Sequence, residues 1–371
     1  MAGLYIHIPF CASRCIYCGF YSTTHLDLRQ QYVDAVCREM ELRSISDDFT
    51  EPISTVYLGG GTPSQLTTAQ LEQLFLYINK VYGNQAEEIT IEANPDDVTP
   101  EFAAMLSQLG INRVSMGAQT FDDARLRFLH RRHTSAQVPI AVQRLRDAGI
   151  HNISVDLMYG FPNETLDDWQ HDIEAALALN VEHISAYCLM IEEGTVLYQW
   201  SMVNSQWSMD EELERQMYEL LIERLTDAGY EHYEISNFAK PGYRSRHNSS
   251  YWHDVPYIGI GAAAHSYDGT CRSWNVADIR EYIAAIKQGE RPAECEVLAP
   301  DTHYNDRITT ALRTSDGLDL TTLTEGHHRH CLHEAEPFIK NGLLNLTGSR
   351  LVLTRRGLFV SDMVMSQLMM V

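Results

Sequence analysis

The sequence predicts an α/β fold, in which a partial (β/α)6 barrel is followed by a smaller, mostly α C-terminal domain with a winged-helix-like hairpin. The first observation is that short β-rich runs alternate with segments of helical apolar spacing, which implies a parallel sheet with right-handed crossovers. The second is that Glu92, Gln119 and Asp156 lie near the carboxyl ends of successive strands, where barrel active sites form. This placement favours a barrel over an open doubly wound sheet.

Six strands are predicted, at residues 4–9, 55–60, 88–94, 113–119, 153–160 and 183–190. The predicted helices cover residues 31–45, 69–81, 101–109, 138–148, 167–179 and 210–228. Gly110 and Gly149 fit helix C-terminal caps, and Thr99 before Pro100 fits an N-cap followed by a first-turn proline. These boundaries support six strand–helix units.

The regular alternation stops after about residue 236, so we expect three regions. These are the barrel at 1–236, a connecting region at 237–299 and a C-terminal domain at 300–371. The last region predicts a helical stretch, a β-hairpin that turns at Gly348 and Ser349, and a short methionine-rich helix. Helices followed by a hairpin are typical of a winged-helix module.

Composition restricts the classes of partner and the compartment. The chain has 371 residues, 50 acidic against 28 Lys and Arg, and a net charge of −22, which argues against a nucleic-acid partner. No apolar run is long enough to cross a membrane, and the amino terminus lacks the features of a signal peptide. Three of the 8 cysteines crowd the N-terminus and five are scattered, a pattern that indicates reduced thiols and a metal site. We therefore expect a cytoplasmic protein.

The strongest motif is the trio Cys11, Cys15 and Cys18, with the spacing C-x3-C-x2-C. Thiolates are the usual ligands of iron–sulfur clusters, and three of them would leave one iron of a [4Fe–4S] cluster open to an outside ligand. A structural zinc site is the alternative, but it usually needs four ligands in two close pairs. His7 could be a fourth ligand, although it lies within the first predicted strand. Packing of three cysteines within eight residues would be an unusual way to fill a core.

This spacing after a first strand, with an aromatic residue at Tyr17, resembles the signature of the radical S-adenosylmethionine (SAM) superfamily. The flanking sequence Tyr5-Ile-His-Ile-Pro-Phe-Cys11 resembles the coproporphyrinogen dehydrogenase-like branch of that superfamily. The resemblance implies a radical SAM barrel, a [4Fe–4S] cluster held by the three cysteines, SAM on the open iron, and an electron donor as a partner.

A glycine-rich turn at residues 59–63 follows the second strand and lets the backbone approach a ligand closely. No Lys-Ser/Thr pair follows, so it is not a P-loop, and taken alone it could equally be a structural turn. The resemblance implies that the SAM-contacting positions are Tyr5, Tyr17, Gly60, Gly61, Thr62, Glu92, Gln119, Arg131 and Asp156. Carboxylates suit ribose hydroxyls and an arginine suits the SAM carboxylate, although capping or salt bridging is an alternative role for each acidic residue.

Two members of this branch compete as templates: the oxygen-independent coproporphyrinogen III dehydrogenase and the heme chaperone of the HemW type. The dehydrogenase carries Cys-Gly-Cys after the trio, whereas this chain has Cys18, Gly19 and Phe20. The dehydrogenase also has an extended N-terminal segment, whereas the first strand is predicted here from residue 4. Both departures weaken the dehydrogenase template.

Residues 246–252 match the H-N-x-x-Y-W motif of the heme chaperone, and the match implies heme-binding roles for His247, Asn248, Tyr251 and Trp252. An imidazole is a suitable axial ligand of heme iron, and the aromatic rings offer flat surface to a macrocycle. Lys240, Arg244 and Arg246 form a basic cluster in the sequence that would suit the heme propionates. The alternative is that His247 is an ordinary hydrogen-bonded histidine.

The sequence therefore predicts a heme chaperone that binds heme and a SAM-ligated [4Fe–4S] cluster, passes heme to an acceptor protein and lacks dehydrogenase activity, so no catalytic residue is assigned. The acceptor is expected to be membrane-associated, and a homodimer is compatible with the sequence. The alternatives are the dehydrogenase itself and, from a different class, a cluster-binding scaffold or redox sensor that binds neither SAM nor heme.

Overall fold

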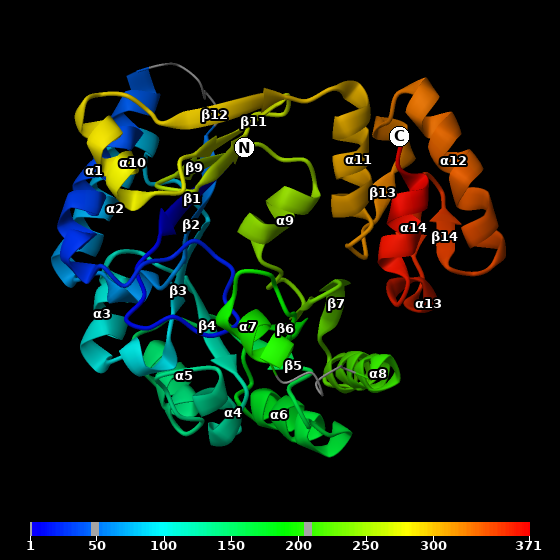
Figure 1. Ribbon diagram of the computed structural model, residues 1–371, viewed down its shortest axis with the longest axis horizontal. Coiled ribbons are helices and arrows are strands. Elements are labelled where there is room, and N and C mark those ends of the chain that lie inside the picture. The colour runs from blue at the N-terminus through cyan, green and yellow to red at the C-terminus, as the bar shows by residue number, and fades with distance from the viewer. Residues whose placement is uncertain (1, 46–51, 204–209) are drawn as a thin grey trace.

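The computed structural model describes residues 2–45, 52–203 and 210–371 (Figure 1). Six parallel strands pair in chain order, and the first and sixth are not paired with each other, so the barrel stays open. The partial barrel predicted from the sequence is confirmed. The strands are β1 (Ala2–Ile8), β2 (Ile53–Gly60), β3 (Glu88–Ala93), β4 (Arg113–Gln119), β5 (Asn152–Tyr159) and β6 (His183–Cys188).

Helices cover the outer face of this sheet, as Figure 1 shows. The N-cap of α3 is Thr99, whose side chain accepts a hydrogen bond from the backbone N–H of Phe102, and Pro100 follows in the first turn as predicted. Gly110 and Gly149 follow α3 and α5 with φ of +78° and +87°, a conformation that favours glycine. The helices are α1 (Arg29–Ile45), α2 (Thr68–Tyr82), α3 (Pro100–Gln108), α4 (Asp123–Phe128), α5 (Gln137–Asp147), α6 (Leu166–Ala178), α7 (Val196–Val203) and α8 (Glu211–Asp227).

The strands alternate between an apolar outer face and a polar inner face, because successive side chains of a strand point to opposite sides. On β4 the buried Val114 and Met116 belong to the core beneath the helices. The intervening Arg113, Ser115 and Gly117 line a cavity inside the barrel. The barrel interior is therefore polar and hollow, whereas the hydrophobic core lies between the sheet and the helices.

Residues after the sixth strand extend both edges of the same sheet. On one edge, β8 (Asn237–Ala239) is antiparallel to β6 and pairs with β7 (Glu231–Glu234). On the other edge, β9 (Tyr257–Ile260) runs parallel to β1 and is followed by antiparallel strands. These are β10 (His265–Tyr267), β11 (Cys271–Asn275) and β12 (Ala293–Val297), with helix α10 (Ile279–Lys287) between the last two.

The short helix α9 (Arg246–Trp252) lies near the middle of the molecule in Figure 1 and contacts β1 and β2. Its His247 touches the inner face near the start of these strands, where a Cβ atom on Gly3 would come within 3.0 Å of the imidazole. Helix α9 therefore closes the amino end of the barrel, opposite the end at which the cysteine loop follows β1.

The C-terminal module has its own buried core and a three-stranded sheet in the order β13-β15-β14. The hairpin turns at Gly348 as predicted, and a short helix closes the chain. The module joins the barrel through β7, where the backbone N–H of Ser315 donates to Tyr233 and Arg313 forms a 2.8 Å ion pair with Glu234. Its elements are α11 (Pro300–Ala311), β13 (Leu318–Asp319), α12 (Glu325–Lys340), β14 (Leu344–Thr347), β15 (Arg350–Leu353), α13 (Arg355–Leu358) and α14 (Ser361–Leu368).

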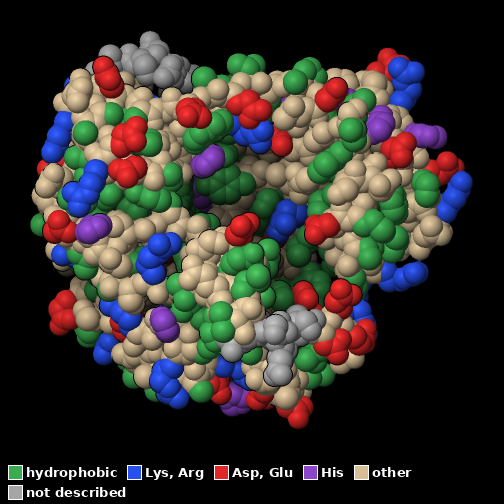
Figure 2. Space-filling model, viewed as in Figure 1, with side chains coloured by type: hydrophobic (Ala, Val, Ile, Leu, Met, Phe, Trp, Pro, Cys, Tyr) green, Lys and Arg blue, Asp and Glu red, His purple; other side chains and the backbone are tan. Residues whose placement is uncertain are grey.

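Figure 2 shows acidic and basic side chains interspersed over one face of the molecule, which is hollowed near its middle. Within residues 2–45, 52–203 and 210–371, no helix combines the length and the apolar character that crossing a membrane requires.

Candidate functional site

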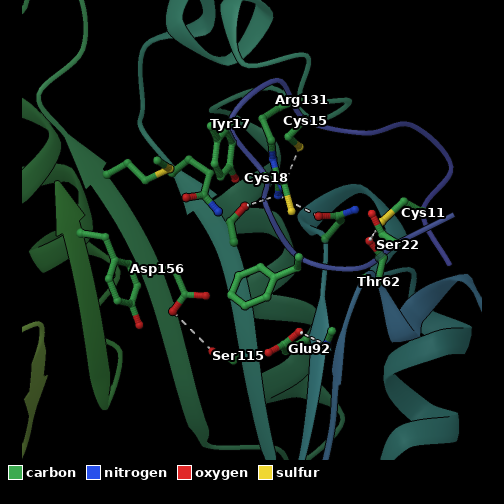
Figure 3. Close-up of a pocket in the computed structure, with 18 of the residues that line it drawn as sticks. Cys11, Cys15, Tyr17, Cys18, Ser22, Thr62, Glu92, Ser115, Arg131 and Asp156 are labelled. Atoms are coloured by element: carbon green, nitrogen blue, oxygen red, sulfur yellow. Dashed lines mark hydrogen bonds between the residues drawn. The ribbon is translucent and has the colours of Figure 1, made fainter. Parts of the chain in front are cut away.

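The cysteine loop follows β1 and is anchored by backbone hydrogen bonds at both ends. The N–H of Cys11 donates to the carbonyl of Thr23 (2.9 Å), and the N–H of Ile16 donates to the carbonyl of Leu129 (3.3 Å). Cys11, Cys15 and Cys18 are free thiols, partly exposed, and all three line the same cavity (Figure 3). The loop therefore presents three sulfur ligands together at the carboxyl end of the sheet.

Two donors reach these sulfur atoms. The Thr62 hydroxyl donates to Cys11 Sγ and the Arg131 Nη1 donates to Cys15 Sγ, each at 3.6 Å. Burial raises the pKa of Cys11 and of Cys18 above the usual range. A bound cation would offset this cost, because thiolates rather than thiols are metal ligands.

The arrangement of the thiols distinguishes the two metal sites that the sequence left open. A structural zinc site usually needs four ligands on one ion, whereas the cysteines of an iron–sulfur cluster bind different irons. Three thiols on one loop fit a [4Fe–4S] cluster with one open iron.

The glycine-rich turn packs directly against the cysteine loop. Gly60 has φ of +111°, and a Cβ atom there would lie 2.4 Å from the His7 ring. A Cβ atom on Gly61 would lie 2.8 Å from the carbonyl carbon of Pro9. Only glycine fits at these positions without displacing its neighbours, so the backbone of the turn itself forms one wall of the cavity.

Two carboxyl groups face the same space below the cysteine loop (Figure 3). Glu92 accepts hydrogen bonds from the Tyr57 hydroxyl (2.8 Å) and from the backbone N–H of Gly60 (3.0 Å). Desolvation inside the barrel raises the pKa of Glu92 to about 7, and the nearby Asp156 adds to the rise. Asp156 accepts from the Ser115 hydroxyl (3.4 Å), and desolvation raises its pKa as well. Both groups could accept hydrogen bonds from the hydroxyls of a ligand.

Arg131 follows α4 and reaches over the cavity. Its Nη2 donates to Asn94 Oδ1 (2.7 Å) and to the carbonyl of Gly117 (2.6 Å). Its Nε is buried and has no hydrogen-bond partner within the described part of the chain. Gln119, at the end of β4, has φ of 68°, a conformation that is costly for a residue other than glycine. The unused Nε–H is a donor for an anionic group such as the carboxylate of SAM.

The cavity has a volume of about 630 Å³, within the usual range for cofactor sites. It brings together most of the residues expected to hold the cluster and SAM. Tyr5 lies apart from the lining, where its hydroxyl shares a 3.0 Å hydrogen bond with His7. The predicted residues that line the cavity are Cys11, Cys15, Tyr17, Cys18, Gly60, Gly61, Thr62, Glu92, Gln119, Arg131, Asp156 and Asn248.

The same cavity reaches helix α9, because Asn248 is part of its lining. The neighbouring His247 is buried, and both its ring nitrogens are hydrogen-bonded: Nδ1 to the Thr55 hydroxyl (2.8 Å) and Nε2 to the Tyr251 hydroxyl (2.9 Å). Trp252 packs edge-on against Tyr233, with ring centres 5.9 Å apart. His247 is therefore a hydrogen-bonded interior residue in this structure.

Comparison with known proteins identifies the chain. The family model of the Radical SAM superfamily matches residues 5–176, and that of the HemN C-terminal domain matches residues 298–360. The chain is 34% identical to the heme chaperone HemW of Bacillus subtilis, over 98% of each chain. It is also 34% identical to the heme chaperone HemW of Mycobacterium tuberculosis, over 99% of this chain and 94% of the relative. The chain belongs to the HemW family of the radical SAM superfamily.

The fold agrees with this assignment. The structure of the Escherichia coli coproporphyrinogen III oxidase HemN, a radical SAM enzyme, superposes with a TM-score of 0.86 over 99% of this chain and 89% of that chain. At 22% sequence identity, that likeness concerns the fold alone. A HemW-family chain and HemN thus share one architecture, and local residues must account for any difference in function.

The basic residues near α9 are engaged within this HemW-family protein. Lys240 lies 3.6 Å from Glu182, and Arg244 lies 2.9 Å from Glu231. Arg246 pairs with Glu87. The three cations that the sequence grouped together therefore each face a different carboxylate, and in this structure none of them is free for a heme propionate.

The cavity residues that were not found from the sequence include Arg113 and Ser115 on β4, and Ser185 and Tyr187 on β6. Each occupies an alternate position of a strand that faces the barrel interior. The alternation of side chains along β4 could have identified two of them. Gln119 was predicted to face the site, and Arg113 and Ser115 precede it by six and four positions, which places them on the same face of an extended strand.

Proposed function

We propose that this protein is a heme chaperone, which binds heme and transfers it to an acceptor protein without coproporphyrinogen dehydrogenase activity. The observation that carries the proposal is that one cavity is lined both by the cluster cysteines and by Asn248 of the H-N-x-x-Y-W helix. The names of the relatives that are 34% identical over nearly the whole chain support it.

At the carboxyl end of the barrel, Cys11, Cys15 and Cys18 would hold the [4Fe–4S] cluster, which would supply one-electron chemistry and an open iron for SAM. We infer that the guanidinium of Arg131 binds the carboxylate of SAM. Glu92 and Asp156 are placed to accept hydrogen bonds from the ribose hydroxyls. The glycine turn at Gly60 lets the ligand lie against backbone with no side chain between them.

At the amino end, we infer that His247 is the residue that ligates heme iron. Burial lowers the pKa of His247 to about 3, and the positive charge of Arg113 adds to the effect. The imidazole is therefore neutral, which is the form that binds metals. Because the Tyr251 hydroxyl is bonded to Nε2, ligation through this nitrogen requires that the hydrogen bond open first.

The chaperone is favoured over the dehydrogenase by the residue after Gly19. Phe20 stands where the dehydrogenase branch has a fourth cysteine, and 71% of its surface is exposed beside the cavity. Met190, also part of the lining, is 66% exposed. An apolar rim of this kind suits a macrocycle that enters and leaves, or an acceptor protein that docks beside it.

We further propose that the protein acts in the cytoplasm, receives an electron from a separate donor and delivers heme to a membrane-associated acceptor. A homodimer is the assembly we expect. The described cysteines are all free thiols, which suits a reducing compartment.

The proposal is tested by anaerobic reconstitution of the cluster, followed by titration with heme and absorption spectroscopy. The wild type should retain heme, and His247→Ala should weaken retention by about tenfold or more, since even the outer partners of metal ligands contribute that much. His253→Ala is the matched control, because this imidazole directly follows the same helix but is exposed. Failure of the wild type to retain heme would refute the chaperone. Conversion of coproporphyrinogen III with consumption of SAM would establish the dehydrogenase instead.

A further inference from the structure

Arg113 is a buried cationic residue of the cavity lining. It is the first residue of β4, only 1% of its surface is exposed, and its side chain is part of the cavity lining. Gln119 ends the same strand beside the SAM residues. At about 3.3 Å of rise per residue, the two positions are roughly 20 Å apart. The backbone of Arg113 therefore lies at the amino end of the sheet, and its charge acts on His247 as well as on Glu92 and Asp156.

Among the described residues, no carboxylate forms an ion pair with the guanidinium of Arg113, and its Nε and Nη1 are buried without a hydrogen-bond partner. The contrast with a second arginine of the barrel, Arg125, is clear. Arg125 lies 2.8 Å from Asp168 and 3.7 Å from Glu164.

The carboxylates around Arg113 are held by other groups. Glu88, at the start of the neighbouring strand, accepts from the backbone N–H groups of Arg246 and His247. Glu92 is bonded to Tyr57 and Gly60, and Asp156 is bonded to Ser115. Arg113 influences the pKa of both acids from a distance but contacts neither. An arginine side chain carries a positive charge in proteins. A buried charge without a partner is destabilising and calls for an anion.

The other groups that face Arg113 are neutral and already bonded. His183 shares hydrogen bonds with the Ser154 hydroxyl (2.8 Å) and the Tyr233 hydroxyl (2.7 Å), and His247 is bonded to Thr55 and Tyr251. Their acceptor atoms are therefore not available to the guanidinium. A carboxylate is a planar anion that suits a guanidinium, because it can accept two parallel N–H bonds from one edge of it.

We infer that Arg113 binds a carboxylate of the cavity ligand and, if the protein is the heme chaperone proposed above, that this carboxylate is a heme propionate. Arg113 would then orient the macrocycle with its propionate edge at the amino end of the barrel, next to His247. The unpaired arginine is a specificity residue, which selects tetrapyrroles that carry a free carboxylate over neutral ones.

The first test is the stability of the ligand-free protein. Arg113→Met removes an unpaired buried charge and keeps a long side chain, so its melting temperature should equal or exceed that of the wild type. Arg125→Met is the matched control, and it should melt at a lower temperature because it breaks ion pairs. A decrease for Arg113→Met as large as that for Arg125→Met would assign Arg113 to structural support and overturn the inference.

The second test compares heme with heme dimethyl ester, in which both propionates are neutral. We expect Arg113→Met to bind heme about tenfold or more weakly than the wild type, as the loss of a charged hydrogen bond predicts. The wild type should bind the ester about as weakly as Arg113→Met binds heme. Arg113→Met should bind heme and the ester with equal affinity. Arg113→Lys should recover part of the affinity for heme, because the charge remains.

The outcomes separate this inference from the chaperone itself. If the wild type retains heme but Arg113→Met retains it equally well, the inference fails and the chaperone stands. If the wild type retains no heme, both fail. Equilibrium dialysis with SAM tests the other source of a carboxylate: SAM binding should be unchanged in Arg113→Met, and its loss with unchanged heme binding would overturn the assignment to heme.

Discussion

The two ends of this barrel meet in one cavity but are built in different ways. At the carboxyl end, loops supply the groups, the cysteine thiols are partly exposed, and the Nε of Arg131 has no partner among the described residues. At the amino end, helix α9 closes the barrel and its groups are bonded internally. His247 uses both ring nitrogens, and its backbone N–H donates to Glu88 (2.9 Å).

The two ends of strand β3 show the difference between the two ends of the barrel. Glu88, at its start, accepts from the backbone N–H groups of Arg246 and His247 and so holds the first turn of α9 in place. Glu92, near its end, faces the cavity with a raised pKa. The carboxyl end is thus organised to receive a ligand before it arrives, whereas a ligand at the amino end must displace contacts that the protein already makes.

The largest effect is expected at the carboxyl end. Replacing Cys11, Cys15 or Cys18 by Ser should reduce the iron and the cluster absorption of the anaerobically reconstituted protein by at least about tenfold, since each thiolate binds an iron of its own. Cys295→Ser is the control, because this thiol is exposed and lies outside the cavity. Full cluster retention in any one of the three variants would show that the site uses a different ligand set.

The sequence predicted the carboxyl end well because its groups lie in short segments. Three cysteines within eight residues and three consecutive glycines are recognisable without knowledge of the fold. The amino end offered no such segment apart from the α9 motif. Arg113, Thr55 and Glu88 are single polar residues near the starts of three strands, and only strand register brings them together around His247.

The fold was also predicted best where the signal lies in one continuous segment. The six strand–helix units were predicted because each strand is long enough to show its apolar pattern. Helices α4 and α7 were not predicted, and they have only six and eight residues. Strands β8 and β10 have three residues each and β9 has four, which is too short for a pattern. The pairing of β9 with β1 joins residues about 250 positions apart, and nothing in either strand alone indicates it.

A smaller effect is expected from Tyr251→Phe, which keeps the aromatic ring at the amino end and removes the hydroxyl bonded to His247. Loss of this buried hydrogen bond should lower the free energy of unfolding by about 1–2 kcal/mol, as measured by denaturant titration. If His247 ligates heme through Nε2, heme affinity should rise by roughly three- to tenfold, because the competing bond is absent. Weaker heme binding would instead indicate that the hydroxyl itself contacts the ligand.

A pH dependence of stability is expected at the carboxyl end. Burial raises the pKa of Glu92 from its ordinary value of 4.5 to about 7, while Tyr57, Asp156, Arg113 and the backbone N–H of Gly60 also act on it.

The folded protein therefore holds the Glu92 proton more tightly than the unfolded chain. This contribution to stability is fully present below pH 4.5 and is lost as the pH rises to about 7, by roughly 3 kcal/mol. Glu92→Gln should remove this part of the slope in unfolding measurements between about pH 4.5 and 7. Bound SAM should also flatten it, because a carboxylate that accepts hydroxyl donors is stabilised in its charged form. Glu164→Gln is the control. Burial also raises the pKa of Glu164 to about 7, but this residue lies outside the cavity lining. The part of the pH slope that Glu164→Gln removes should therefore be the same with and without SAM. If SAM changed both parts equally, Glu92 would not be a ligand contact, and the distinction between a receptive carboxyl end and a closed amino end would rest on the cysteines and Arg131 alone.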